Sequence, residues 1–231
     1  RAGLFASKYY LDHGNYQRSE EIARKYFEIN TKNYYLGLQY AKILELNRKY
    51  DACIKILGKI WILPNEGATE GRIIWRNANI GKALEYFEKT SYRKALESIH
   101  NSKKWPANLG VGKPFEVDER FEDFISMLCL QKTGNQTSAK ELRDRIIHQP
   151  PQQMVSDDTN DFLTAWLWKE SGNKSKGDSL MNHLIKRNLS SVKRIWYQAF
   201  YSGELQEVEK NVGEPGRTDQ LFFFLRWLIK V

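Results

Sequence analysis

The sequence predicts an all-α protein, a right-handed α-solenoid of about six helical hairpins. Three observations lead to this prediction: short turn segments recur along the chain, small residues keep a fixed distance from each turn, and large residues keep another. A single hairpin cannot bury its own apolar face, so hairpins of this kind stack on their neighbours. Along the chain, one pair of helices is expected around each turn.

The turns predict where each pair of helices meets. Their last residues are separated by 34, 42, 44 and 38 positions, and the two longer middle intervals contain the insertions "LPNEGATEGR" and "WPANLGVGKP". Each turn would join two antiparallel helices. The five turns are Gly14–Tyr16, Arg48–Tyr50, Thr90–Tyr92, Gly134–Gln136 and Gly172–Lys174.

Side-chain size around the turns supports the hairpins. Two helices approach closely only where side chains are small, and larger side chains fill the space around that crossing. Three positions after each turn's last residue, every residue is small: Ser19, Cys53, Ala95, Ala139 and Gly177. Nine positions before it, four of five are small: Ser7, Ala41, Ala83, Met127 and Ala165. Six before it, all are large: Tyr10, Leu44, Tyr86, Leu130 and Trp168.

The hairpins resemble tetratricopeptide repeats over about Leu4 to Leu189, and the first interval of 34 is the period of that family. The resemblance implies a solenoid with a concave, ligand-binding face. Other repeats depart from the pattern, because Arg48 and Thr90 replace the turn glycine while Gln136 and Lys174 replace the turn aromatic. The stretch "GNYQRSEEIARKYFEINTKN" matches best, at Gly14, Tyr16, Ser19, Ala23 and Tyr26.

A narrower resemblance rests on two segments, "ILPNEGATEGR" and "WPANLGVGKPFEVDERFED". They look like the repeat region of a Bacteroidetes family, in which the repeats follow a mutarotase-like β-sandwich of unknown function. This resemblance implies a bacterial protein that is either the C-terminal portion of a longer chain with an upstream domain or a stand-alone relative. It also implies a carbohydrate context, by association only.

The domain prediction is one continuous solenoid. Residues 1–189 form five hairpins, and residues 190–231 form a degenerate hairpin plus a hydrophobic C-terminal capping helix. The last segment, "TDQLFFFLRWLIKV", has almost no polar face, so we expect burial within the chain rather than in a dimer or under further chain.

The Gly-x-Gly-Lys loop in "WPANLGVGKP" does not have the spacing of a phosphate-binding loop. That loop needs a glycine where Ala107 stands and a hydroxyl where Pro114 stands. We therefore interpret it as an inter-repeat connection in which Pro106 ends a helix and Asp118 caps the next one. A partner contact through Trp105 or Lys113 is the alternative, since long ordered loops often carry function.

The residues do not suggest catalysis. The four histidines have no short metal-ligand spacing, no carboxylate pair stands out as general acid and base, and Cys53 and Cys129 are expected to be buried free thiols. We therefore expect no catalytic residue, no metal, no cofactor and no enzyme activity. No signal peptide or run of 18 apolar residues is visible, so a cytoplasmic location without a membrane contact is expected.

The leading functional hypothesis is a non-catalytic scaffold that binds a peptide or protein segment in the concave groove. The alternatives are an accessory or assembly region of a carbohydrate-active protein, and nucleic-acid binding through a surface with net charge +8. A competing interpretation places many of the groove aromatics in the core between repeats. The groove residues expected from the resemblance are Tyr35, Lys42, Glu45, Asn77, Phe124, Gln131, Trp166 and Lys169.

Overall fold

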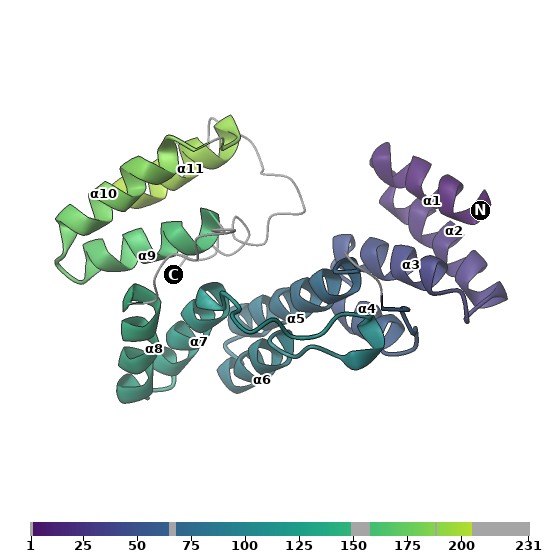
Figure 1. Ribbon diagram of the computed structural model, residues 1–231, viewed down its shortest axis with the longest axis horizontal. Coiled ribbons are helices and arrows are strands. Elements are labelled where there is room, and N and C mark those ends of the chain that lie inside the picture. Colours follow the sequence, from purple (N-terminus) through teal and green to yellow (C-terminus); the bar gives the residue numbers. More distant parts are fainter. Residues whose placement is uncertain (1, 65–67, 149–157, 188, 205–231) are drawn as a thin grey trace. The chain divides into compact units, whose positions relative to one another are not determined.

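The computed structural model describes residues 2–64, 68–148, 158–187 and 189–204 (Figure 1). Within these ranges the chain forms eleven α-helices and one 3₁₀-helix, with no strand, and consecutive helices pack on each other. The predicted all-α class is confirmed. The chain divides into two compact units, residues 1–117 and 118–231, which are described separately. No helix in the described ranges has the length and apolar character needed to cross a membrane.

The first unit contains three hairpins, α1–α2, α3–α4 and α5–α6. Neighbouring hairpins pack mainly through α2 against α3 and α4 against α5, and their first helices also touch, α1 against α3 and α3 against α5. The helices are α1 (Ala2–Asp12), α2 (Tyr16–Ile29), α3 (Tyr34–Leu46), α4 (Tyr50–Leu57), α5 (Glu70–Glu88) and α6 (Tyr92–Ser102), and the 3₁₀-helix η1 (Ala107–Leu109) follows.

The described residues of the second unit form two hairpins, α7–α8 and α9–α10, and one further helix. Helix α7 packs against α9, and the ring of Tyr197 in α11 stacks on Phe162 in α9 at 4.5 Å. The predicted C-terminal capping helix lies outside the described residues. The helices are α7 (Arg120–Lys132), α8 (Gln136–His148), α9 (Asp158–Glu170), α10 (Lys174–Ile185) and α11 (Ser191–Ser202).

All five predicted turns join the two helices of a hairpin, and all five have the same backbone conformation. The first turn residue always has a positive φ, from 54° at Thr90 to 83° at Gly172. In each turn the backbone N–H of the second turn residue donates to the carbonyl five residues earlier, at an N–O distance of 2.8–2.9 Å. This is the hydrogen bond of a Schellman motif. Arg48 adopts this conformation too, so the loss of glycine has not changed the turn.

The predicted close crossings are also confirmed. The residues three after and nine before the turns' last residues are all buried. Ser19 Oγ donates a hydrogen bond of 2.7 Å to the carbonyl of Ser7, which joins the two helices directly. At Gly177 an added Cβ would lie 2.7 Å from the carbonyl oxygen of Ala165, so this crossing has no room for a side chain.

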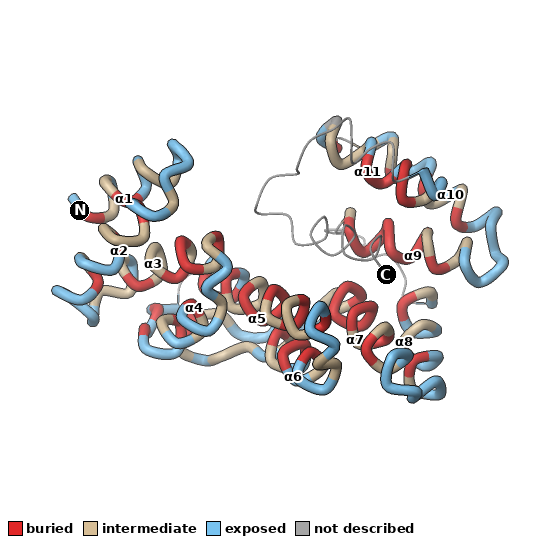
Figure 2. The backbone as a smooth tube through the Cα atoms, turned by 180° about the vertical axis from the view of Figure 1, so that it is seen from behind, coloured by how far each residue is buried: buried red, intermediate tan, exposed pale blue. Residues whose placement is uncertain are grey.

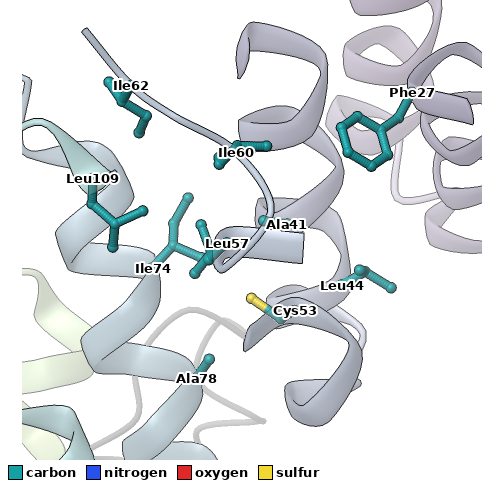
Figure 3. Packing of buried hydrophobic residues seen from close by; sticks show 10 residues of the cluster. All are labelled: Phe27, Ala41, Leu44, Cys53, Leu57, Ile60, Ile62, Ile74, Ala78 and Leu109. Atoms are coloured by element: carbon teal, nitrogen blue, oxygen red, sulfur yellow. The ribbon is translucent and has the colours of Figure 1, made fainter. Parts of the chain in front are cut away.

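The core of the first unit fills the space between α3, α4 and α5 (Figure 3). Its members include Leu57 and Cys53, each with no exposed surface. Full burial of a leucine side chain stabilises the fold by about 1.5–3 kcal/mol. Burial raises the pKa of the Cys53 thiol well above its ordinary value and that of Cys129 to about 12, and both cysteines are free, as predicted.

From the second hairpin onward, the first helix is more buried than the second. Much of α5 and α9 is buried, whereas α8 and α10 are largely exposed (Figure 2). Side chains of the first helices therefore serve mainly to pack neighbouring helices. This asymmetry limits how many of them can reach a partner.

Candidate binding pocket

A pocket of about 660 Å³ lies on the first unit. Its lining comes from α4, from α5, from the end of α6 and from the connection 103–119 that follows α6. The volume is within the usual range for small-ligand sites, about 300–1,000 Å³. The lining residues are Ile54, Trp75, Asn79, Lys82, Asn101, Lys103, Lys104, Trp105, Pro106 and Lys113.

Four lysines give the pocket its charge, and none of the lining residues in the described ranges is acidic. Lys82 Nζ lies 2.5 Å from Oδ1 of Asp51, and this hydrogen bond raises the pKa of Lys82. Lys104 Nζ donates to the amide oxygen of Asn101 at 2.7 Å, a neutral partner that leaves the ammonium charge in place. The pocket is therefore cationic at neutral pH.

Two tryptophans form the apolar part of the lining. Trp75 Nε1 donates to the carbonyl of Asn101 at 2.9 Å, which holds its ring against the end of α6. The guanidinium of Arg72 lies 4.5 Å from the centre of the Trp105 ring, and its Nη2 donates to the carbonyl of Ser102 at 2.8 Å. Trp105 Nε1 is buried without a hydrogen-bond partner among the described residues, so the lining tryptophan retains an unused donor.

The connection that supplies Trp105 and Lys113 is anchored by Asn108. The side-chain amide of Asn108 donates to the carbonyls of Leu57 and Ile60, each at 2.8 Å. Its own carbonyl accepts from the amide of Ile62, also at 2.8 Å. These three bonds tie the connection to the segment after α4, so this wall of the pocket is fixed before any ligand binds.

Net charge is divided unevenly between the two units. Residues 1–117 contain 20 Lys and Arg against 12 Asp and Glu, a net charge of +8, whereas residues 118–231 contain 16 of each. The whole net positive charge of the protein therefore belongs to the unit that contains the pocket. A field of this sign attracts anionic partners.

Four of the expected groove residues lie in the first unit, outside the pocket. Tyr35 is 59% exposed and its ring stacks on that of Tyr34 at 4.1 Å. Lys42 pairs with Glu70 at 2.9 Å, so its charge is matched by a carboxylate of α5. Glu45 and Asn77 are partly exposed, and neither lines the pocket.

The other four expected residues lie in the second unit, and three of them contact neighbouring residues of that unit. Phe124 has no exposed surface, and its ring centre lies 5.6 Å from that of Trp166 in an edge-to-face contact. Phe124 is therefore a core residue, as the competing interpretation expected. Lys169 Nζ donates to the carbonyl of Tyr201 and lies 4.7 Å from the centre of its ring. Gln131 is exposed.

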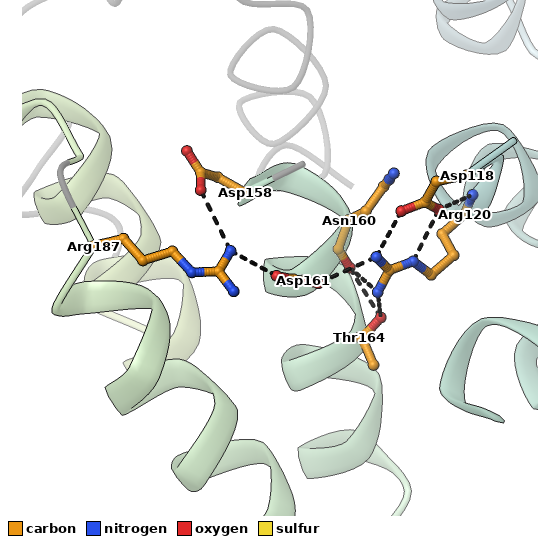
Figure 4. A network of polar contacts seen from close by, with 7 residues as sticks. All are labelled: Asp118, Arg120, Asp158, Asn160, Asp161, Thr164 and Arg187. Atoms are coloured by element: carbon orange, nitrogen blue, oxygen red, sulfur yellow. Dashed lines mark hydrogen bonds and ion pairs between the residues drawn. The ribbon is translucent and has the colours of Figure 1, made fainter. Parts of the chain in front are cut away.

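The second unit contains a buried polar network (Figure 4). Arg120 pairs with Asp118 at 2.6 Å and with Asp161 at 3.1 Å, and donates to Thr164 Oγ1 at 2.9 Å. Arg187 holds the other oxygen of Asp161 at 2.8 Å. Because these groups bond to one another, we interpret the network as a clamp between α7, α9 and the segment directly after α10 rather than a ligand site.

Trp105 and Lys113 were predicted only as an alternative contact, and four further lining residues were not predicted: Trp75, Lys82, Lys103 and Lys104. The signal present in the sequence was "SKKWP", two lysines beside a tryptophan at the end of a predicted helix. In the part of the chain that the structure describes, no three His, Cys, Asp or Glu residues cluster as a metal site would require. No family model matches the chain, and the comparison with curated proteins found no match either.

Proposed function

We propose that this protein is a non-catalytic interaction module that binds an acidic segment of a partner protein in the pocket of its first unit. We also propose that its hairpins are of tetratricopeptide type and form a right-handed solenoid. The observation that carries the function is one pocket lined by two tryptophans and four lysines, of which Lys82 is matched by Asp51, with no acidic residue in the lining.

The pocket replaces the expected groove as the binding site for two reasons. Phe124 is fully buried, and Lys42 is matched by Glu70, so neither offers the contact that the groove hypothesis assigned to it. Lys104 and Lys113 are exposed in the pocket lining, and Lys104 bonds to the neutral side chain of Asn101. The ammonium groups would bind carboxylates, and the apolar wall would contact the intervening aliphatic stems.

The test is fluorescence anisotropy with the full chain and labelled octaglutamate, octalysine and octathymidylate as probes, at low and moderate salt. Octaglutamate should bind and octalysine should not. Binding should weaken with salt, since exposed ion contacts are screened. Tighter binding of octathymidylate than of octaglutamate would instead support nucleic-acid recognition.

Two matched double variants locate the site. Lys104→Gln with Lys113→Gln removes two charges from the pocket, whereas Lys25→Gln with Lys32→Gln removes two exposed charges elsewhere in the same unit. The pocket variant should bind octaglutamate about tenfold more weakly than the control variant, a difference of about 1.4 kcal/mol. Equal loss in both variants would mean that net charge alone, not the pocket, binds the probe.

A further inference from the structure

Phe115 is the most exposed large apolar side chain in the described part of the chain, at 102% of its reference surface. Phe5, the next, is 75% exposed. A side chain with all of its apolar surface in water contributes nothing to the packing of this unit. Exposed aromatic residues of this kind are often the anchors of binding surfaces.

Phe115 also lies close to the pocket. It follows Lys113, a lining residue, by two positions, and two residues span at most about 7 Å of chain. A ligand segment of four residues, extended at about 3.3 Å per residue, can therefore touch both.

The local sequence restricts the backbone from Lys113 to Phe115, where the chain bends. Pro114 fixes its own φ near −65° and restricts Lys113 to extended conformations. Upstream, Asn108 bonds the same connection to the carbonyls of Leu57 and Ile60. The arrangement lowers the conformational entropy that binding would remove, because part of the surface is already ordered.

Resting on the proposed function, we infer a sequence preference for the ligand: acidic residues enter the lysine pocket, and a large apolar residue next to them contacts Phe115. The partner is a protein segment with clustered Asp or Glu beside Phe, Leu or a similar side chain. Charge complementarity selects this occupant: the lining has four lysines, one of them matched by Asp51, and no acidic residue, and residues 1–117 have a net charge of +8.

The experiment uses the full chain with labelled octaglutamate and eight derivatives, each with one glutamate replaced by phenylalanine. At least one derivative should bind about five- to tenfold more tightly than octaglutamate. Phe115→Ala should remove that gain and leave octaglutamate affinity within twofold of wild type. The matched control Phe5→Ala, on the exposed side of α1, should keep the gain.

The outcomes separate the two proposals. If octaglutamate binds through the pocket lysines but no phenylalanine position improves affinity, or the gain survives in Phe115→Ala, this inference is wrong and the proposed function stands. If no peptide binds at all, both are wrong. Circular dichroism of both alanine variants checks that the helices are retained, as expected for two exposed side chains.

Discussion

The guanidinium of Arg120 lies 3.1 Å from the carboxylate of Asp161, and the two side chains are 1% and 0% exposed. Arg120 stands at the start of α7 and Asp161 in the first turn of α9, so this pair joins the first helices of two successive hairpins. Asp118 and Arg187 bring further opposite charges to the same pair. The clamp is therefore a buried network in which each charge has a partner.

Replacing Arg120 with methionine should destabilise the second unit by about 3 kcal/mol, because Asp118 and Asp161 would lose their shared partner while remaining buried or partly buried. Hydrogen exchange of α9 amides at increasing urea concentration measures the loss locally. The control is Lys140→Met, at an exposed site of α8. Equal protection of α9 in the two variants would mean that the network contributes no stability.

Asp118 should make the second unit sensitive to acid. Burial by itself raises the pKa of Asp118, but the hydrogen bonds and charge of Arg120 outweigh burial and hold the pKa below the ordinary 3.8. The folded state thus binds this proton less readily than the unfolded state. The stabilisation is present above pH 3.8 and is lost as pH falls through the lower folded-state pKa.

The variant Asp118→Asn tests the direction of this pH dependence. At pH 7 the variant should be less stable than wild type by about 1–2 kcal/mol, because a charged acceptor of Arg120 is lost. The difference should shrink as pH falls below 3.8, because the unfolded wild-type chain then binds a proton that the folded state takes up only at lower pH. Urea unfolding at several pH values measures it. A difference that stays constant down to pH 2 would show that protonation of Asp118 is not the cause.

Thr90→Gly should stabilise the first unit. Thr90 has φ of 54°, in the left-handed region that is unfavourable for a β-branched residue by about 1–2 kcal/mol. Glycine removes this strain but adds unfolded-state entropy, so the net gain should be about 0.5–1 kcal/mol. Thr133→Gly, at the C-cap of α7 with φ −94° and one position before the left-handed turn residue Gly134, should destabilise instead. Thermal unfolding distinguishes the two, and a lower melting temperature for Thr90→Gly would contradict the account.

Gly177→Ala should destabilise the α9–α10 hairpin by about 1–2 kcal/mol. The new methyl group would lie 2.5 Å from the hydroxyl of Tyr201 and 2.7 Å from the carbonyl of Ala165, so the helices must separate. Gly112→Ala is the control, because nothing lies within 4 Å of its added Cβ. Hydrogen exchange of α10 amides measures the effect; matching exchange in the two variants would argue against a tight crossing.

The hairpins were predictable from the sequence because they depend on local patterns. Tyr50 and Tyr92, with small residues three positions later, predicted turns where Arg48 and Thr90 replace glycine, and the structure has the same left-handed turn at both. The buried state of Phe124 was not predictable, since a helical period does not separate an inner wall from a core.

The pocket could not be predicted from the sequence, for a different reason. It depends on a connection that folds back so that Asn108 bonds the carbonyl of Leu57, 51 residues earlier. No period or short motif encodes such a contact. The sequence nevertheless offered Trp105 and Lys113 as an alternative contact, because they lie in a long connection and long ordered loops often carry function.

The most direct test of the binding proposal is an NMR titration of the full chain with octaglutamate, following the indole N–H signals of its seven tryptophans. The signals of Trp105 and Trp75 should shift with the same dissociation constant. Trp105 should shift more, because its N–H has no hydrogen-bond partner within the described ranges whereas that of Trp75 is bonded to Asn101. The signal of Trp166, in the second unit, should not move. Shifts of Trp166 without shifts of Trp105 and Trp75 would contradict the account.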